Sequence, residues 1–217
     1  MRFSADALLF DSDETLVSSL QSVIRVWSWW AESYGMTLKE AMSRVEVHGR
    51  PAAAIIADLL PEEQVREGVQ RLVDAEVADA AAGGVQAVPG AVELLASLPE
   101  GRWAVVTSGS RRVAEARLTP VGIRPKFLIT SDDVSRHKPH PEPFLVAAEQ
   151  LGLDPARCIV VEDSPAGLAS GKAAGMATIA LTTTHQAEQL EADATVADLT
   201  SVSIRVAEAG DLEVTVG

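Results

Sequence analysis

Short apolar runs alternate with helical patterns along most of the chain. The runs are "ADALLF" at residues 5–10, "RWAVVTSG" at 102–109, "KFLITSDD" at 126–133, "RCIVVEDS" at 157–164 and "MATIALT" at 176–182. Their near-continuous hydrophobicity is typical of buried parallel strands. Helical patterns lie between them at residues 90–98, 111–122, 141–152 and 164–175, several of them ending in glycine as helix C-termini do. The alternation predicts an α/β fold, a Rossmann-like parallel sheet with helices on both faces.

One long segment interrupts this alternation. From about residue 17 to residue 88 the chain shows only helical patterns, with the amphipathic stretches "LQSVIRVWSWWAESYG" and "PEEQVREGVQRLVDAEVADA" joined by "HGRPAAAIIADLL". Glycine and proline in "GGVQAVPG" mark a linker at its end. We therefore expect an all-helical domain of residues 17–88, inserted into a core domain formed by residues 1–16 and 89–217. The closing "SVSIRVAEAGDLEVTVG" predicts a hairpin at the edge of the sheet.

Composition narrows the choice of partners. With 217 residues the chain is long enough for one domain with a sizeable core, or for a core domain plus a smaller inserted one. Its 47% hydrophobic and 23% charged content is ordinary for a globular protein. Its net charge of -13 argues against nucleic-acid binding, which requires a basic surface. We recognise no charged and then apolar leader and no apolar run approaching the ~20 residues of a membrane span. We expect a cytoplasmic protein without a membrane partner, a monomer or a weak dimer. The single Cys158 excludes an internal disulfide.

Polar side chains gather where the predicted strands end. They are Asp11 and Asp13 after the first strand, Thr107 and Ser108 after the second, Lys138 in the loop after the third, and Glu162 and Asp163 after the fourth. Ligands of open parallel sheets bind at this edge. Taken singly, an acid here can cap the following helix and a lysine can face solvent. Because all of them belong to one edge, we interpret them as a site.

Four acids in one crevice require a counter-ion, and carboxylate oxygens suit Mg²⁺. A divalent cation beside a lysine and backbone amides binds an anion, and a phosphoryl group fits that description. One carboxylate can attack phosphorus while a second transfers protons. The residues therefore point to phosphoryl-transfer chemistry.

Four motifs, "DSDET", "VVTSG", "HKPHPEPF" and "VVEDSPAGLASGKAAG", resemble in order and spacing those of the haloacid-dehalogenase-like hydrolases. The resemblance covers essentially the whole chain. Helices inserted after the first motif are similar to the C1-type cap of the phosphatase and phosphomutase branch. Within that branch, "HGRP", "VPGAV" and "WAVVTSGSR" are most similar to glycerol-phosphate and deoxysugar-phosphate phosphatases.

The resemblance implies a role for each matching catalytic position. Asp11 is the expected nucleophile, and Asp13 is expected to protonate the leaving alcohol and then to activate water. Thr107 and the Ser108 amide are expected to hold phosphate oxygens. Lys138 is expected to pair with the phosphate and with Asp11.

The resemblance also implies the metal ligands. Mg²⁺ is expected to be held by Asp11, the backbone carbonyl of Asp13, and Asp163. Glu162 is expected either as a direct ligand or as a partner of the ligands.

Glu14 departs from the family pattern, because most capped members carry glycine there, which allows a sharp turn. A glutamate at this position resembles the DxDET motif of the polymerase-tail phosphatases, which lack a large cap. Two interpretations remain open. The side chain points to solvent or forms a salt bridge with the cap, or it modifies the hinge and cap closure.

The cap is expected to choose the leaving group. His48 and Arg50, in the polar "HGRP" turn, are the candidate substrate-binding residues. Trp27, Trp29 and Trp30 are expected to pack inside the cap and over the hinge, with sugar stacking as the alternative.

The expected function is a Mg²⁺-dependent phosphatase of small sugar or polyol phosphate monoesters that forms an aspartyl-phosphate. One alternative is a phosphomutase similar to β-phosphoglucomutase, which hands the phosphoryl group to another hydroxyl. Another is a non-catalytic sugar-phosphate binder with the same fold.

Overall fold

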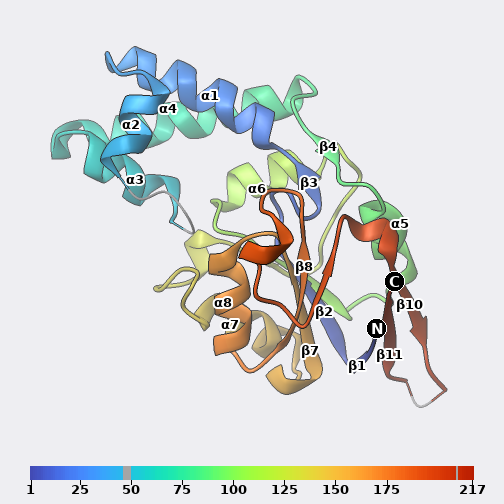
Figure 1. The fold of residues 1–217 in the computed structure, drawn as a ribbon. Helices are drawn as coiled ribbons and strands as arrows, with labels where there is room; N and C mark the ends of the chain where they lie inside the picture. The colour runs from blue at the N-terminus through green and yellow to red at the C-terminus, as the bar shows by residue number, and fades with distance from the viewer. Residues whose placement is uncertain (46–49, 209) are drawn as a thin grey trace.

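The core of the computed structural model, which describes residues 1–45, 50–208 and 210–217, is a six-stranded parallel sheet of order β6-β5-β2-β7-β8-β9 (Figure 1). Its strands are β2 (Ala7–Phe10), β5 (Trp103–Val106), β6 (Leu128–Ile129), β7 (Cys158–Glu162), β8 (Ala177–Leu181) and β9 (Ala194–Val196). The predicted α/β class and parallel sheet are confirmed. From β2 the chain adds β5 and β6 on one side and β7, β8 and β9 on the other. The strand order therefore reverses beside β2.

The two faces of the sheet are covered differently. Helices α7 (Glu142–Leu151) and α8 (Pro165–Ala173) pack on one face, where Ala7 and Leu9 of β2 are buried. On the other face Leu8 and Phe10 contact α5 (Ala91–Ser97), α6 (Arg111–Leu118) and a second sheet. Alternate residues of β2 thus enter two hydrophobic cores, which explains its unbroken apolar sequence.

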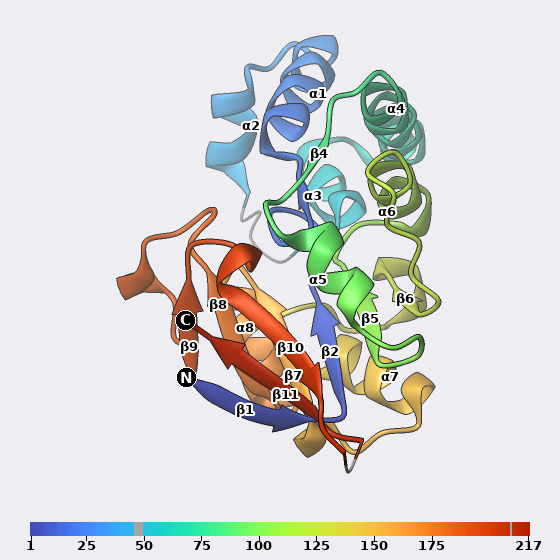
Figure 2. The same ribbon diagram turned by 90° about the vertical axis from the view of Figure 1, so that its right-hand side faces the viewer.

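The second sheet is antiparallel and joins the two ends of the chain (Figure 2). Its order is β1-β11-β10, from β1 (Arg2–Ala5), β11 (Leu212–Val216) and β10 (Val202–Val206). The predicted C-terminal hairpin is present, but its expected position at the edge of the parallel sheet is wrong. It pairs with β1, because Val214 and Leu212 contribute to the core under this face.

A group of helices stands apart from the sheet, between two short paired strands (Figure 1). They are α1 (Leu20–Ser33), α2 (Leu38–Arg44), α3 (Ala52–Leu59) and α4 (Glu62–Ala81), entered through β3 (Val17–Ser18) and left through β4 (Gln86–Ala87). Since β3 and β4 pair antiparallel, both connections lie side by side, and we refer to this pair of connections as the hinge. The domain boundaries expected at residues 16/17 and 88/89 stay a prediction. Single 3₁₀ turns are η1 (Ser131–Asp133), η2 (Pro155–Arg157), η3 (Ala187–Gln189) and η4 (Leu199–Ser201).

The tryptophans of α1 divide between core and surface. Trp27 and Trp30 are buried among the four helices, and the Trp30 indole donates a hydrogen bond to the Gly68 carbonyl at 2.8 Å. Trp29 is 47% exposed and lies beneath the Arg71 guanidinium, 5.5 Å from its ring centre. The expected packing is therefore found for Trp27 and Trp30 and is wrong for Trp29.

Candidate active site

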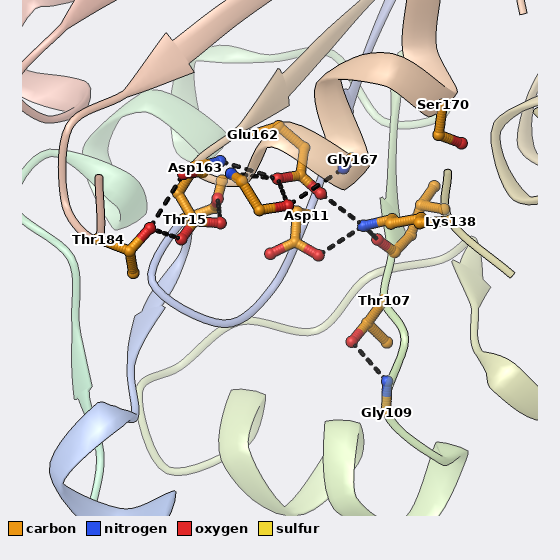
Figure 3. Close-up of polar contacts among 12 residues, drawn as sticks. Asp11, Thr15, Thr107, Gly109, Lys138, Glu162, Asp163, Gly167, Ser170 and Thr184 are labelled. Carbon is orange, nitrogen blue, oxygen red and sulfur yellow. Dashed lines mark hydrogen bonds and ion pairs between the residues drawn. The ribbon is translucent and has the colours of Figure 1, made fainter. Parts of the chain in front are cut away.

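The register of the parallel sheet places the predicted acids at one level. Phe10 of β2 lies opposite Val105 of β5 and Val161 of β7. The next residues along, Asp11 and Glu162, therefore lie side by side at this end of the sheet. These side chains converge with those of Asp163 and Lys138 (Figure 3).

Lys138 is the cation of this cluster. Its Nζ donates to Asp11 Oδ1 at 2.6 Å, to Glu162 Oε1 at 2.8 Å and to the Val106 carbonyl at 2.9 Å. Three acceptors use all the protons of an ammonium group. Burial alone would lower the pKa of Lys138, but the adjacent Asp11 and Glu162 carboxylates raise it above its ordinary value. The lysine is therefore charged, and it can contact a phosphate only by releasing one of these partners.

Glu162 is held on both carboxylate oxygens. Oε1 accepts from Lys138, and Oε2 accepts from the Asp163 amide at 2.9 Å and from the Ser164 amide and hydroxyl at 2.8 Å each. The carboxylate lies against α8 so closely that a Cβ on Gly167 would meet Oε1 at 1.7 Å. Glycine at this point of the fourth motif thus makes room for the acid. The contacts of Glu162 thus hold Lys138 and the strand-to-helix turn in place.

Asp11, Glu162 and Asp163 form a group suited to a metal ion. Each offers one carboxylate oxygen, and these oxygens lie within 4.8 Å of one another. Two threonine hydroxyls also donate to Asp163, that of Thr184 at 2.6 Å and that of Thr15 at 3.5 Å. Burial, with the neighbouring acids, raises the pKa of Asp11 to about 7 and that of Asp163 to about 9. Three buried carboxylates against one ammonium leave an excess of negative charge, so this all-oxygen set fits a divalent cation.

Thr107 and Ser108 lie at the end of β5, as expected. Thr107 is buried, and its hydroxyl accepts from the Gly109 amide at 3.1 Å, while Ser108 lines the cleft described below. The turn brings a hydroxyl and backbone amides to the edge where the acids lie. This is the arrangement expected for a group that holds phosphate oxygens.

The Asp13 carboxylate contacts residues other than those of the metal cluster. Its Oδ1 accepts from the Ser19 hydroxyl at 2.6 Å and from Arg117 Nη1 at 2.7 Å, and its side chain is 32% exposed. The sequence interpretation missed both partners. Arg117 does carry a signal, because it falls with Val113 and Leu118 on the buried face of α6, where an apolar residue is expected.

Glu14 has the backbone conformation that glycine would adopt, with φ 61°. Its carboxylate accepts from the Ser19 amide at 2.5 Å and the Leu20 amide at 2.6 Å. Amides at the start of a helix have no acceptor within the helix, and Ser19, the N-cap residue of α1, does not cap it with its own side chain. Glu14 therefore caps α1 at the hinge, and the interpretation that it points to solvent is wrong.

A cleft of about 610 Å³ separates the helical insertion from the sheet edge. On the core side it is lined by Asp13, Ser108, Arg117 and Asp163. The insertion contributes mostly apolar side chains, namely Leu20, Val23, Ile24, Trp27, Leu38, Met42, Ile55, Val69 and Val73. Arg50 also lines the cleft, and its Nη2 donates to Asp58 at 2.7 Å. The other predicted cap residue, His48, lies outside the described residues.

Comparison with known proteins identifies the family. Residues 8–181 match the family described as haloacid dehalogenase-like hydrolase, and the chain belongs to it. The resemblance inferred from the four motifs is thereby confirmed.

Curated relatives align over nearly the full length. Hexitol phosphatase A of Escherichia coli (strain K12) is 37% identical, covering 94% of this chain and 96% of the relative. Validoxylamine A 7'-phosphate phosphatase of Streptomyces hygroscopicus subsp. limoneus is 41% identical over 89% and 94%. Phosphatases named for glycerol 1-phosphate and 2-deoxyglucose 6-phosphate are also relatives, in agreement with the predicted branch. Among solved structures, CbbY of Rhodobacter sphaeroides in complex with phosphate shares the fold, with TM-score 0.78, 24% identity and coverage of 90% and 95%.

Proposed function

We propose that this chain is a Mg²⁺-dependent phosphatase that hydrolyses small sugar or polyol phosphate monoesters through an aspartyl-phosphate on Asp11. The observation that carries the proposal is the buried cluster in which Lys138 joins Asp11 to Glu162 beside Asp163. The family and the curated relatives, which are phosphatases of sugar and polyol esters, support this class of substrate.

In the first step Asp11 is the nucleophile. Lys138 holds its Oδ1, and in the described part of the chain no donor contacts Oδ2, which can attack phosphorus. As the Asp11–phosphorus bond forms, the bond from phosphorus to the ester oxygen breaks, and Asp13 gives its proton to that oxygen.

In the second step Asp13 accepts a proton from water. The water oxygen attacks phosphorus, the Asp11–phosphorus bond breaks, and inorganic phosphate leaves. Thr107 and the Ser108 amide hold phosphate oxygens through both steps, and the positive charge on Lys138 offsets the negative charge that develops there.

The Mg²⁺ would be held by Asp11, Asp163 and the Asp13 carbonyl, with Glu162 as a further oxygen donor or as a partner of these ligands. When bound, it supplies positive charge that brings the phosphate and the Asp11 carboxylate together. The hydroxyls of Thr184 and Thr15 donate to the Asp163 carboxylate and so hold it in its orientation.

We propose that residues 17–88 act as a cap that excludes water and selects the leaving group. Arg50 and His48 are the proposed substrate contacts. A mutase would need cationic contacts for a second phosphate, whereas the described residues of the cap contribute only Arg50 as a cation to the cleft. This difference favours hydrolysis over phosphoryl transfer to a second hydroxyl.

Within the described part of the chain, none of the helices has the length and apolarity needed to cross a bilayer. A cytoplasmic location, the absence of nucleic-acid and membrane partners, and a monomeric or weakly dimeric state stay predictions.

Release of inorganic phosphate from a panel of sugar and polyol phosphates, with Mg²⁺ or EDTA, tests the proposal. We expect turnover with Mg²⁺ only, and Asp11→Asn should lower kcat by roughly 10³-fold or more because the nucleophile is lost. Asp13→Asn should lower it by about 10²-fold or more. As a control, Asp74→Asn, on the outer surface of α4, should keep full activity.

Equal turnover in EDTA, or full activity of Asp11→Asn, would exclude this mechanism. Interconversion of glucose 1-phosphate and glucose 6-phosphate without release of phosphate would select the mutase. Binding of these esters without any turnover would select the non-catalytic binder.

A further inference from the structure

A buried ion pair joins the helical insertion to the core helix beneath it. Arg117 of α6 donates from Nη2 to Glu76 Oε1 of α4 at 2.8 Å. Arg117 is only 5% exposed and Glu76 6%. Removing both charges from water costs several kcal/mol per ion, and such a pair is often no more stable than apolar residues of the same volume. Stability alone therefore does not account for this pair.

The same guanidinium contacts the proposed acid and base. Arg117 Nη1 donates to Asp13 Oδ1 at 2.7 Å. Its Nε is buried and has no partner among the described residues, so Asp13 and Glu76 together fix the orientation of the guanidinium. Glu76 lies on the cap, 41 residues from Arg117 in the sequence, and Asp13 lies on the active-site loop, 104 residues from it.

The contacts of Asp13 are all on one oxygen. Oδ1 accepts from both Arg117 and the Ser19 hydroxyl, whereas Oδ2 accepts from no residue that the structure describes. With Oδ1 held from two sides, the carboxylate cannot rotate freely. Oδ2 is the oxygen left to carry the proton, and Asp13 lines the cleft where the leaving group lies in the proposed reaction.

We propose that Arg117 is a positioning residue for proton transfer, and that Glu76 makes its orientation depend on the packing of cap helix α4 against α6. The inference rests on the proposed phosphatase activity. In the first step the proton passes from Asp13 Oδ2 to the ester oxygen as its bond to phosphorus breaks, and in the second a proton returns from water to Oδ2. Arg117 exchanges no proton and does not touch phosphorus.

The same two helices provide a matched control. Arg112 of α6 and Asp74 of α4 form an ion pair at 2.6 Å on the outer side of the contact, with side chains 54% and 52% exposed. This outer pair ties the same helices together but lies away from the cleft. Removal of either pair should change the packing of the two helices, whereas only removal of the buried Arg117–Glu76 pair should change proton transfer.

The test compares two esters in a single turnover. Sorbitol 6-phosphate releases a poor leaving group that needs a proton, whereas p-nitrophenyl phosphate releases a phenolate that does not. In the double variant Arg117→Met with Glu76→Met, which removes both buried charges, we expect alcohol release to slow by about 10-fold or more. Release of p-nitrophenolate should stay within about twofold, and the outer variant Arg112→Met with Asp74→Asn should be within about twofold on both esters.

Equal losses on the two esters, or no loss on either, would overturn the proposal. If the double variant does not fold, Glu76→Gln provides the test. It keeps the side-chain volume while removing the charge, and it should show the same difference between the esters, with a smaller size; an equal effect on both esters again overturns the proposal. A wild-type enzyme that releases phosphate from neither ester would refute the proposed function as well, whereas an active wild type with unaffected variants would refute only the role of Arg117.

Discussion

In the core domain the ionisable side chains of Asp11, Lys138 and Asp163 are buried at the sheet edge, whereas on the cap side of the cleft Leu20 and Ile24 are apolar and partly exposed. Asp11 and Asp163 directly follow parallel strands, so the register of the sheet sets their positions, and Lys138 reaches them from the loop before α7. The cap residues Leu20 and Ile24 lie on α1, which follows β3 of the paired β3–β4 connections. In the proposed function the chemistry therefore belongs to strand ends, and selection of the leaving group belongs to the helices of the cap.

The core side should be the more sensitive of the two to loss of a single charge. Lys138→Met leaves Asp11 and Glu162 buried without their cation, so we expect the free energy of unfolding to fall by about 3–5 kcal/mol. Urea denaturation at pH 7 measures it, with Lys126→Met as the control because that ammonium is on the surface. A loss below about 1 kcal/mol would mean that the cluster is balanced in some other way.

The charge excess on the core side also predicts how metal binding depends on pH. Because the pKa values of Asp11 and Asp163 are raised to about 7 and about 9, the folded protein favours their protonated forms. In EDTA, stability should fall as pH rises from 6 through these values, since both acids must ionise inside the protein. Mg²⁺ should therefore raise Tm by more at pH 9 than at pH 6.

Thermal unfolding in EDTA and in Mg²⁺ at the two pH values checks this expectation. Asp163→Asn serves as the control, because it removes a proposed ligand and should reduce the effect of Mg²⁺ at both values. A Mg²⁺-induced rise in Tm that is larger at pH 6 would contradict the assignment of these acids to the metal.

The cap side should respond in selectivity rather than in chemistry. Ile24→Ala removes part of the apolar wall, and we expect kcat/KM for sugar phosphates to change roughly 3- to 10-fold while p-nitrophenyl phosphate changes less. Stability should stay within about 0.5 kcal/mol, because Ile24 is 41% exposed. Val92→Ala, equally exposed but remote from the cleft, is the control. Identical changes on every ester would show that this wall does not contact the leaving group.

The smallest effect is expected at the hinge between the two sides. Glu14→Ala loses the carboxylate that caps α1, while residue 14 keeps its positive φ. The free energy of unfolding should therefore fall by about 1 kcal/mol. Glu14→Gly loses the same cap, but glycine adopts φ 61° without strain. The loss of the cap and the relief of backbone strain should nearly cancel in the free energy of unfolding. Urea denaturation of both variants measures these changes in the free energy of unfolding. Equal losses would mean that backbone strain at residue 14 is unimportant.

The strands of the parallel sheet and the residues of its edge could be predicted from local sequence patterns. Hydrophobic runs marked five of the six strands of the parallel sheet, and the polar residues after them marked the acids and Lys138, because parallel strands that end in acids place those acids at one edge. The sixth strand, β9, and the N-terminal strand β1 carry weaker patterns, since three or four residues give little periodicity.

The contacts of each side chain could not be predicted in this way, because they depend on how distant elements pack. Asp13 was recognisable as an acid, but its contacts with Ser19 and Arg117 depend on where α1 and α6 pack. Glu14 departs from a glycine motif in the sequence, and its role as the cap of α1 depends on where the first turn of that helix lies. Local patterns record which residues are buried, because burial repeats along an element. They do not record which distant helix covers them, because that depends on the packing of the whole chain.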